Sequence, residues 1–150
     1  MIIRREEKRG ERGQSLVELA LILPLLLIIL AGVLDLGRMY YAYVMVTDAA
    51  AEGAAYAIVN PPDNPTDPAD TNAAKIRARA LSASGGLVEE DGAVEIHCPT
   101  CPNTMSGDSI TVTVTYDFSV MTPFINVLVP DGVIPVSATA SESVLSGAVD

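Results

Sequence analysis

The sequence has few of the charged residues that soluble enzymes and nucleic-acid-binding proteins carry. Only 19% of its 150 residues are charged, below the share of roughly 25% that is usual for soluble domains. Nine residues are Lys or Arg and nineteen are Asp or Glu, so the net charge is −10. Phosphate contacts need a basic surface, and we therefore expect no nucleic-acid partner. A hydrophobic share of 49% also argues against a disordered chain. The length has room for one domain with an appended segment, and not for two full cores.

Histidine and cysteine are scarcer still. One His and two Cys are too few for a zinc site or for a small domain held together by several disulfides. The sequence also lacks a G-x-S-x-G elbow, a phosphate-binding glycine loop and an H-E-x-x-H pair. We therefore expect a protein that is not an enzyme and that uses no metal, cofactor or small-molecule substrate.

What the sequence does have is a long apolar run between a basic and an acidic region. Five of the nine basic residues stand in the first twelve positions, whereas the chain beyond Gly13 has four basic and sixteen acidic residues. Leu16–Leu34 contains Glu18 as its only charge. As a helix, this run spans about 28 Å, which is close to the thickness of a bilayer core.

This pattern predicts a single-pass protein of the cytoplasmic membrane. By the positive-inside rule, residues 1–13 are a basic cytoplasmic leader, residues 14–35 are a transmembrane helix, and the acidic remainder lies outside the cytoplasm. A cleaved secretory signal peptide is the alternative, because it also has a basic start and an apolar run. However, Ala31 and Gly32 lie in no good A-x-A cleavage pattern.

The helix-forming sequence continues beyond the apolar run. No proline interrupts it before Pro61, so we expect one helix from Gln14 to Val59, with residues 36–60 as its extracytoplasmic continuation. Small residues recur at a spacing of four on this part.

Ala49, Gly53 and Ala57 form one such row, which would let another backbone approach closely. Alanine is also simply the strongest helix former, which would explain the row without any contact. A helix of this length cannot bury its own apolar face, and we expect the following residues to supply a surface for it.

Residues 61–71 are a Pro-rich linker, and residues 72–150 predict a small α+β extracytoplasmic domain. Asp70 or Thr71 is expected to cap a short helix that ends at Gly85 and Gly86. Strict alternation predicts a half-buried antiparallel strand over residues 109–120, with further strands over residues 93–98 and 134–144. Residues 122–129 are apolar and fit either a helical turn or a short strand. The expected fold is α+β, with the long N-terminal helix packed on a small antiparallel sheet and one short helix.

Two groups of residues in this domain are candidate sites. Asp63, Asp67 and Asp70 could hold Ca²⁺, but their spacing is not that of an EF-hand loop, and a solvated turn is the preferred interpretation. Cys98 and Cys101 fit a structural disulfide on an extracytoplasmic loop. Free thiols and a redox centre are the alternatives for this pair, although a redox centre normally opens a helix in a βαβ unit.

The segment RGQSLVE, Arg12–Glu18, combines a glycine after a basic stretch with a carboxylate one turn into an apolar helix. A charge at the centre of a membrane helix costs about 2.5–3.5 kcal/mol, and somewhat less near its end. This arrangement resembles the processing site of type IV pilin-like proteins. The longer stretch from Arg12 to Ala57 is similar to the TadE-like family of the tight-adherence (Flp) pilus machinery, and the similarity continues loosely over Val112–Phe124.

The resemblance implies a pilin-like fold and a membrane-anchored pseudopilin or minor pilin. A prepilin peptidase would cut after Gly13, making Gln14 the new N-terminus, and Glu18 would be the acidic assembly residue. The expected partners are membrane lipid, the peptidase, other pilus subunits and platform proteins of the inner membrane. Major pilins of the Flp type have Tyr after this Glu, and Leu19 here favours an accessory subunit. An unprocessed single-pass protein with an acidic extracytoplasmic binding domain is the alternative.

Overall fold

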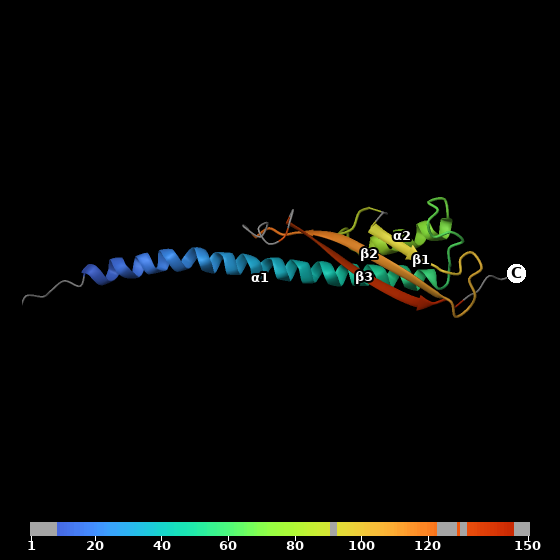
Figure 1. The fold of residues 1–150 in the computed structure, drawn as a ribbon, viewed down its shortest axis with the longest axis horizontal. Coiled ribbons are helices and arrows are strands. Elements are labelled where there is room, and N and C mark those ends of the chain that lie inside the picture. Colours follow the sequence, from blue (N-terminus) through green and yellow to red (C-terminus); the bar gives the residue numbers. More distant parts are fainter. Residues whose placement is uncertain (1–8, 91–92, 123–128, 130–131, 146–150) are drawn as a thin grey trace, which may run out of the picture.

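The structure is a computed structural model that describes residues 9–90, 93–122, 129 and 132–145. Its elements are, in chain order, α1 (Arg9–Ala57), α2 (Thr71–Ala83), β1 (Val94–His97), β2 (Ser109–Ser119) and β3 (Val133–Ser143). Figure 1 shows α1 as a rod whose C-terminal part is covered by the sheet and α2, while its N-terminal part projects alone. The predicted α+β fold, with a long N-terminal helix on a small antiparallel sheet, is confirmed.

The bounds of α1 differ from the expected ones at both ends. The helix already includes Arg9, the first residue that the structure describes, and so it extends before Gln14, because strong helix formers surround Gly10 and Gly13. It ends at Ala57 instead of Val59. The last turn loosens over residues 58–60, where Ile58 and Asn60 still donate to the carbonyls of Ala54 and Tyr56. A regular helix through Pro61 would make the proline ring clash with the carbonyl of residue 57.

The three strands form an antiparallel sheet in the order β1-β2-β3. Val112 at the centre of β2 pairs with Ile96 on one side and Ala140 on the other. The alternation predicted for β2 is present, since Ile110, Val112 and Val114 are fully buried between more exposed neighbours. Period-two alternation therefore identified both the strand and its buried face.

The core lies between this sheet face, α2 and the C-terminal part of α1. It is unusually rich in alanine on the helical side, which lets the helices and the sheet approach closely. The buried cluster consists of Val46, Ala49, Ala50, Ala54, Ala57, Ala73, Ile76, Ala80, Val88, Val94, Ile96, Ile110, Val112, Val114 and Val144. A second, smaller cluster of Ala42, Phe118 and Val136 continues it towards the projecting part of α1.

α2 begins and ends as the sequence indicates. Asp70 is its N-cap, and the chain leaves the helix through Gly85 and Gly86, which both have positive φ. Two features favour glycine at position 85. Its φ is +63°, and a Cβ there would lie only 2.8 Å from Cε of Met45. Of the ambiguous segment 122–129, only Thr122 and Val129 lie within the described residues.

Candidate assembly surface on the N-terminal helix

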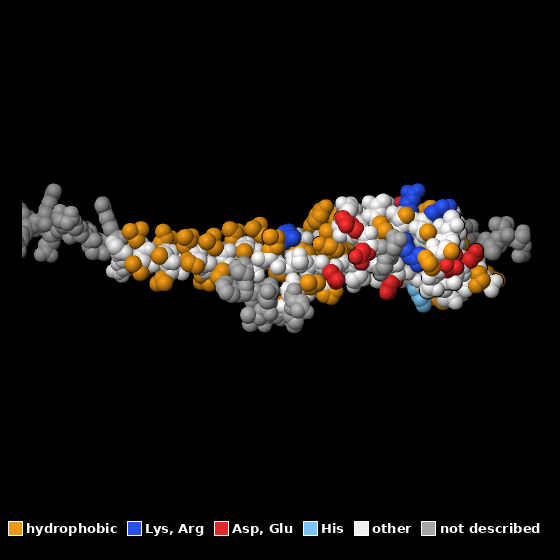
Figure 2. Space-filling view, turned by 90° about the horizontal axis from the view of Figure 1, so that it is seen from above, with side chains coloured by type: hydrophobic (Ala, Val, Ile, Leu, Met, Phe, Trp, Pro, Cys, Tyr) orange, Lys and Arg blue, Asp and Glu red, His pale blue; other side chains and the backbone are white. Residues whose placement is uncertain are grey.

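The projecting part of α1 exposes apolar side chains on all its faces. Between Leu16 and Leu34, the exposed fractions of the large hydrophobic residues run from 40% at Ile28 to 74% at Leu21. Figure 2 shows these side chains along the projecting half, while acidic and basic side chains gather over the opposite end. By length and composition, α1 can cross a membrane, and the rest of the protein buries none of its most apolar window.

The residues predicted for processing and assembly lie at the start of this surface. Gly13 is helical and exposed, and a Cβ placed there would meet nothing within 4 Å. Glu18 lies one turn further along, where its Oε1 accepts a hydrogen bond of 3.2 Å from Nε2 of Gln14. The structure therefore brings Gln14 and Glu18 together on one helix face. Both are presented outward, away from the folded domain.

Asp35 marks the other end of the apolar surface and joins α1 to the sheet. It is 8% exposed. Its Oδ2 accepts hydrogen bonds from the backbone N–H groups of Met121, at 3.1 Å, and Thr122, at 2.7 Å, and from the hydroxyl of Thr122. Its Oδ1 pairs with Arg38 at 3.0 Å, and the Arg38 guanidinium lies 5.3 Å from the centre of the Phe118 ring.

Sequence reasoning missed this contact. Asp35 follows the apolar run directly, and its local pattern is that of an ordinary charge at the end of a membrane segment. Its partners Met121 and Thr122 lie more than eighty positions away. The one available signal was Arg38, three residues later on the same face of the helix, which is typical of an ion pair.

The row of small residues predicted on the aqueous part of α1 is used within the chain. Ala49 and Ala57 are fully buried in the main core, and Gly53 is buried beside them. A Cβ at Gly53 would lie 3.1 Å from Cγ1 of Val112 and 3.3 Å from Cβ of Ala80. The backbone of α1 thus approaches α2 and β2 closely at this position.

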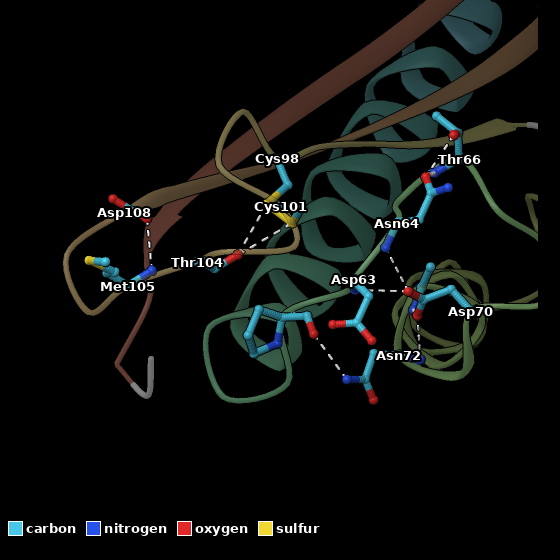
Figure 3. The surroundings of a disulfide bond; sticks show 12 residues. Asp63, Asn64, Thr66, Asp70, Asn72, Cys98, Cys101, Thr104, Met105 and Asp108 are labelled. Carbon is cyan, nitrogen blue, oxygen red and sulfur yellow. Dashed lines mark hydrogen bonds between the residues drawn. A yellow bond between two sulfur atoms is a disulfide. The ribbon is translucent and has the colours of Figure 1, made fainter. Parts of the chain in front are cut away.

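Cys98 and Cys101 form a disulfide with a Cα–Cα distance of 5.6 Å. Figure 3 shows the pair on the loop that follows β1, with Thr104 beside both sulfur atoms. Thr104 is almost completely buried, and its Oγ1 lies 3.4 Å from Sγ of Cys101. The bond therefore belongs to the packing of the β1–β2 connection.

The Asp-rich linker is organised around one carboxylate. Asp70 accepts four backbone hydrogen bonds of 2.8 Å, from Asp63 and Asn64 on Oδ2 and from Asn72 and Ala73 on Oδ1 (Figure 3). Desolvation raises the pKa of Asp70, but these four N–H groups outweigh it and hold the pKa below its ordinary value.

This arrangement uses both oxygens of Asp70 to hold the linker and to cap α2. Asp67 accepts a hydrogen bond from the N–H of Ala69 in the same way. Within the described part of the chain, no three His, Cys, Asp or Glu side chains are grouped so that they could hold a metal ion. The carboxylates of Asp67 and Asp70 thus bind backbone N–H groups of the linker itself and of the start of α2.

Comparison with protein families identifies the segment that carries the exposed surface. Residues 13–55 match the family described as TadE-like protein. The match covers less than half of the chain and confirms, over these residues, the resemblance to the TadE-like family seen in the sequence. Among curated proteins and among solved structures, nothing matches the chain. The TadE-like segment begins at Gly13 and ends two residues before the end of α1, so it is almost the whole helix.

Proposed function

We propose that this protein is a membrane-anchored pseudopilin or minor pilin that supports assembly of a tight-adherence pilus or a related secretion system. The observation that carries the proposal is the combination of a TadE-like segment with a projecting apolar helix that holds one carboxylate, Glu18, near its start. The proposed orientation has the basic leader in the cytoplasm and the sheet domain outside the cytoplasmic membrane.

Processing is part of this proposal. A prepilin peptidase would cut after Gly13 and release the leader with its five basic and three acidic residues. The new amino group of Gln14 would then lie one helical turn from Glu18. Since both charges would stand at nearly the same depth in lipid, each needs a partner of opposite charge.

We propose that the Glu18 carboxylate of one subunit pairs with the Gln14 amine of a neighbouring subunit. Such a pair satisfies both charges in a medium of low dielectric constant and fixes the axial register between two helices. Removing one partner leaves the other charge buried without compensation, which costs several kcal/mol. Assembly would therefore depend on Glu18, whereas folding of the sheet domain would not.

The test is Glu18→Leu in the native host. The variant should insert and be processed, because it removes a desolvation cost, but it should no longer co-purify with other pilus components. Glu18→Asp should be intermediate, since its side chain is shorter. Glu52→Leu is the matched control, because it removes the same charge from the aqueous part of the same helix. Wild-type recovery of pilus components with Glu18→Leu would contradict this role and return the chain to a plain membrane anchor.

A further inference from the structure

We propose that the end of the sheet where β2 and β3 meet α1 is a second membrane contact, seated in the interfacial layer of the bilayer that α1 crosses. The inference rests on the proposed membrane span and adds a second lipid-binding surface to it. The observation that carries it is the position of β2 along α1. The last turns of the projecting helix and the ends of two strands lie at one level, where the folded domain begins (Figure 1).

Asp35 sets the depth of this end. Its carboxylate accepts hydrogen bonds from the backbone of Met121 and Thr122, which follow the end of β2 after Val120. Asp35 is also the first residue after the apolar run Leu16–Leu34. The chain that leaves β2 is therefore fixed at the level where α1 passes from lipid to water.

Near the contact between Asp35 and residues 121–122, the β2–β3 end faces helix positions that belong to the apolar run. A groove of about 390 Å³ is lined by Ile29 and Val33 of α1 together with Val120, Val129 and Ile134. Ile29 lies six residues before Asp35, which corresponds to about 9 Å along a helix. The β2–β3 end thus reaches below the level of Asp35, on the side of the membrane span.

Two apolar side chains on this end are exposed. Met121 is 75% exposed, although it follows a strand whose alternate residues are buried, and Val133 at the start of β3 is 39% exposed. In water such residues would form an unexplained apolar patch, whereas beside a membrane helix they extend the surface that lipid already covers.

The charges nearest to this end fit an interface with phospholipid. Arg38 stands one turn above Asp35, and its side chain is about half exposed. Arg38 is the ion-pair partner of Asp35, and the exposed half of its side chain still lies at the height where lipid phosphate would meet it. The occupant that we propose is therefore the headgroup and upper acyl region of the bilayer.

The absence of tryptophan from the chain allows a direct measurement. Single-tryptophan variants of the full-length protein are reconstituted into phosphatidylcholine–phosphatidylglycerol vesicles that contain lipids brominated near the headgroup end of the acyl chain. Met121→Trp reports the proposed contact. Met105→Trp is the matched control, because Met105 is 69% exposed and lies next to the other end of β2. Leu25→Trp reports the membrane span.

We expect Met121→Trp to emit at shorter wavelength than Met105→Trp and to lose most of its emission to the brominated lipid, while Met105→Trp keeps its emission. Val133→Trp should behave like Met121→Trp. Agreement between the two variants shows that the quenching does not come from a local disturbance caused by one substitution. Quenching of Leu25→Trp by lipids brominated deep in the chain, with no quenching at positions 121 and 133, would overturn this inference and leave the proposed function standing. No quenching at position 25 would overturn both.

Discussion

At the scale of single residues, Asp70 and Asp35 each bind backbone N–H groups of another segment of the chain. The role of Asp70 could be predicted from the sequence in part, and that of Asp35 could not. Asp70 was predictable as an N-cap, since it stands just before a helical pattern. Its hold on Asp63 and Asn64 was not, because it depends on how the prolines fold the linker back. Asp35 gave no comparable signal, since its partners come from the far end of β2.

Asp70→Asn should destabilise the protein by about 1–2 kcal/mol at neutral pH, the scale of losing hydrogen bonds to a charged acceptor. Asparagine can still cap α2 with its one acceptor oxygen, but its amide group then faces the N–H groups of Asp63 and Asn64. Urea unfolding of the detergent-solubilised protein, followed by circular dichroism, measures the difference. Asp67→Asn is the control and should cost less. Among the described residues, the side chain of Asp67 accepts one backbone hydrogen bond, from the N–H of Ala69.

The pH dependence of this effect follows from the lowered pKa of Asp70. A carboxyl group whose folded pKa lies below its unfolded value contributes stability that is fully present above the unfolded pKa, near 3.9. That contribution is lost as the pH falls through the folded pKa. The gap between wild type and Asp70→Asn should therefore close in acid, and a gap that stays constant from neutral pH to below the folded pKa would contradict this role.

At the scale of elements, periodicity predicted the strand β2 and its buried face, but it did not predict the ends of α1. The alternation around Val112 and Val114 gave β2 and its buried face, because one face of the strand lies on the core. The helical residues before Gln14 were missed, and the end of α1 at Ala57 was predicted two residues too late. Helix ends depend on small differences in propensity and on the clash of Pro61 with the last turn.

Gly53 tests whether α1 and the domain pack as closely as the structure has them. Gly53→Leu should lower stability by about 1–3 kcal/mol, because the added side chain has no room between Val112 and Ala80. Gly37→Leu on the same helix is the matched control, since a Cβ at Gly37 meets nothing within 4 Å. Thermal unfolding of both variants in detergent gives the comparison. Equal stabilities would mean that this row does not pack on α2 and β2.

The disulfide tests how much the β1–β2 connection contributes. Replacing Cys98 and Cys101 together by Ser should lower the free energy of unfolding by no more than about 2 kcal/mol, because the bond closes a short loop. The proposed role in pilus assembly should persist at permissive temperature. The measurement is unfolding of the double variant beside the wild type under oxidising conditions. Rapid alkylation of both thiols in wild-type protein without reductant would show that the bond does not form in the cell.

At the scale of the whole molecule, the chain consists of one helix that carries both the family signature and the exposed surface, and a domain that is anchored along its second half. The class of fold followed from the apolar run, the helix-forming continuation and the alternation of β2. The position of the domain along α1 did not, because it depends on Asp35 and on the close approach at Gly53. Those contacts join segments that no local pattern connects.

The most direct test of the account is the N-terminal sequence and intact mass of the protein purified from the membranes of its native host. If it is a processed pilus subunit, the mature chain begins at Gln14, and loss of the leader changes its net charge from −10 to −12. The Gly13→Leu variant should keep its leader, since the small residue before the cut is replaced. A mature chain that begins at Met1 or near Gly32 would contradict the account.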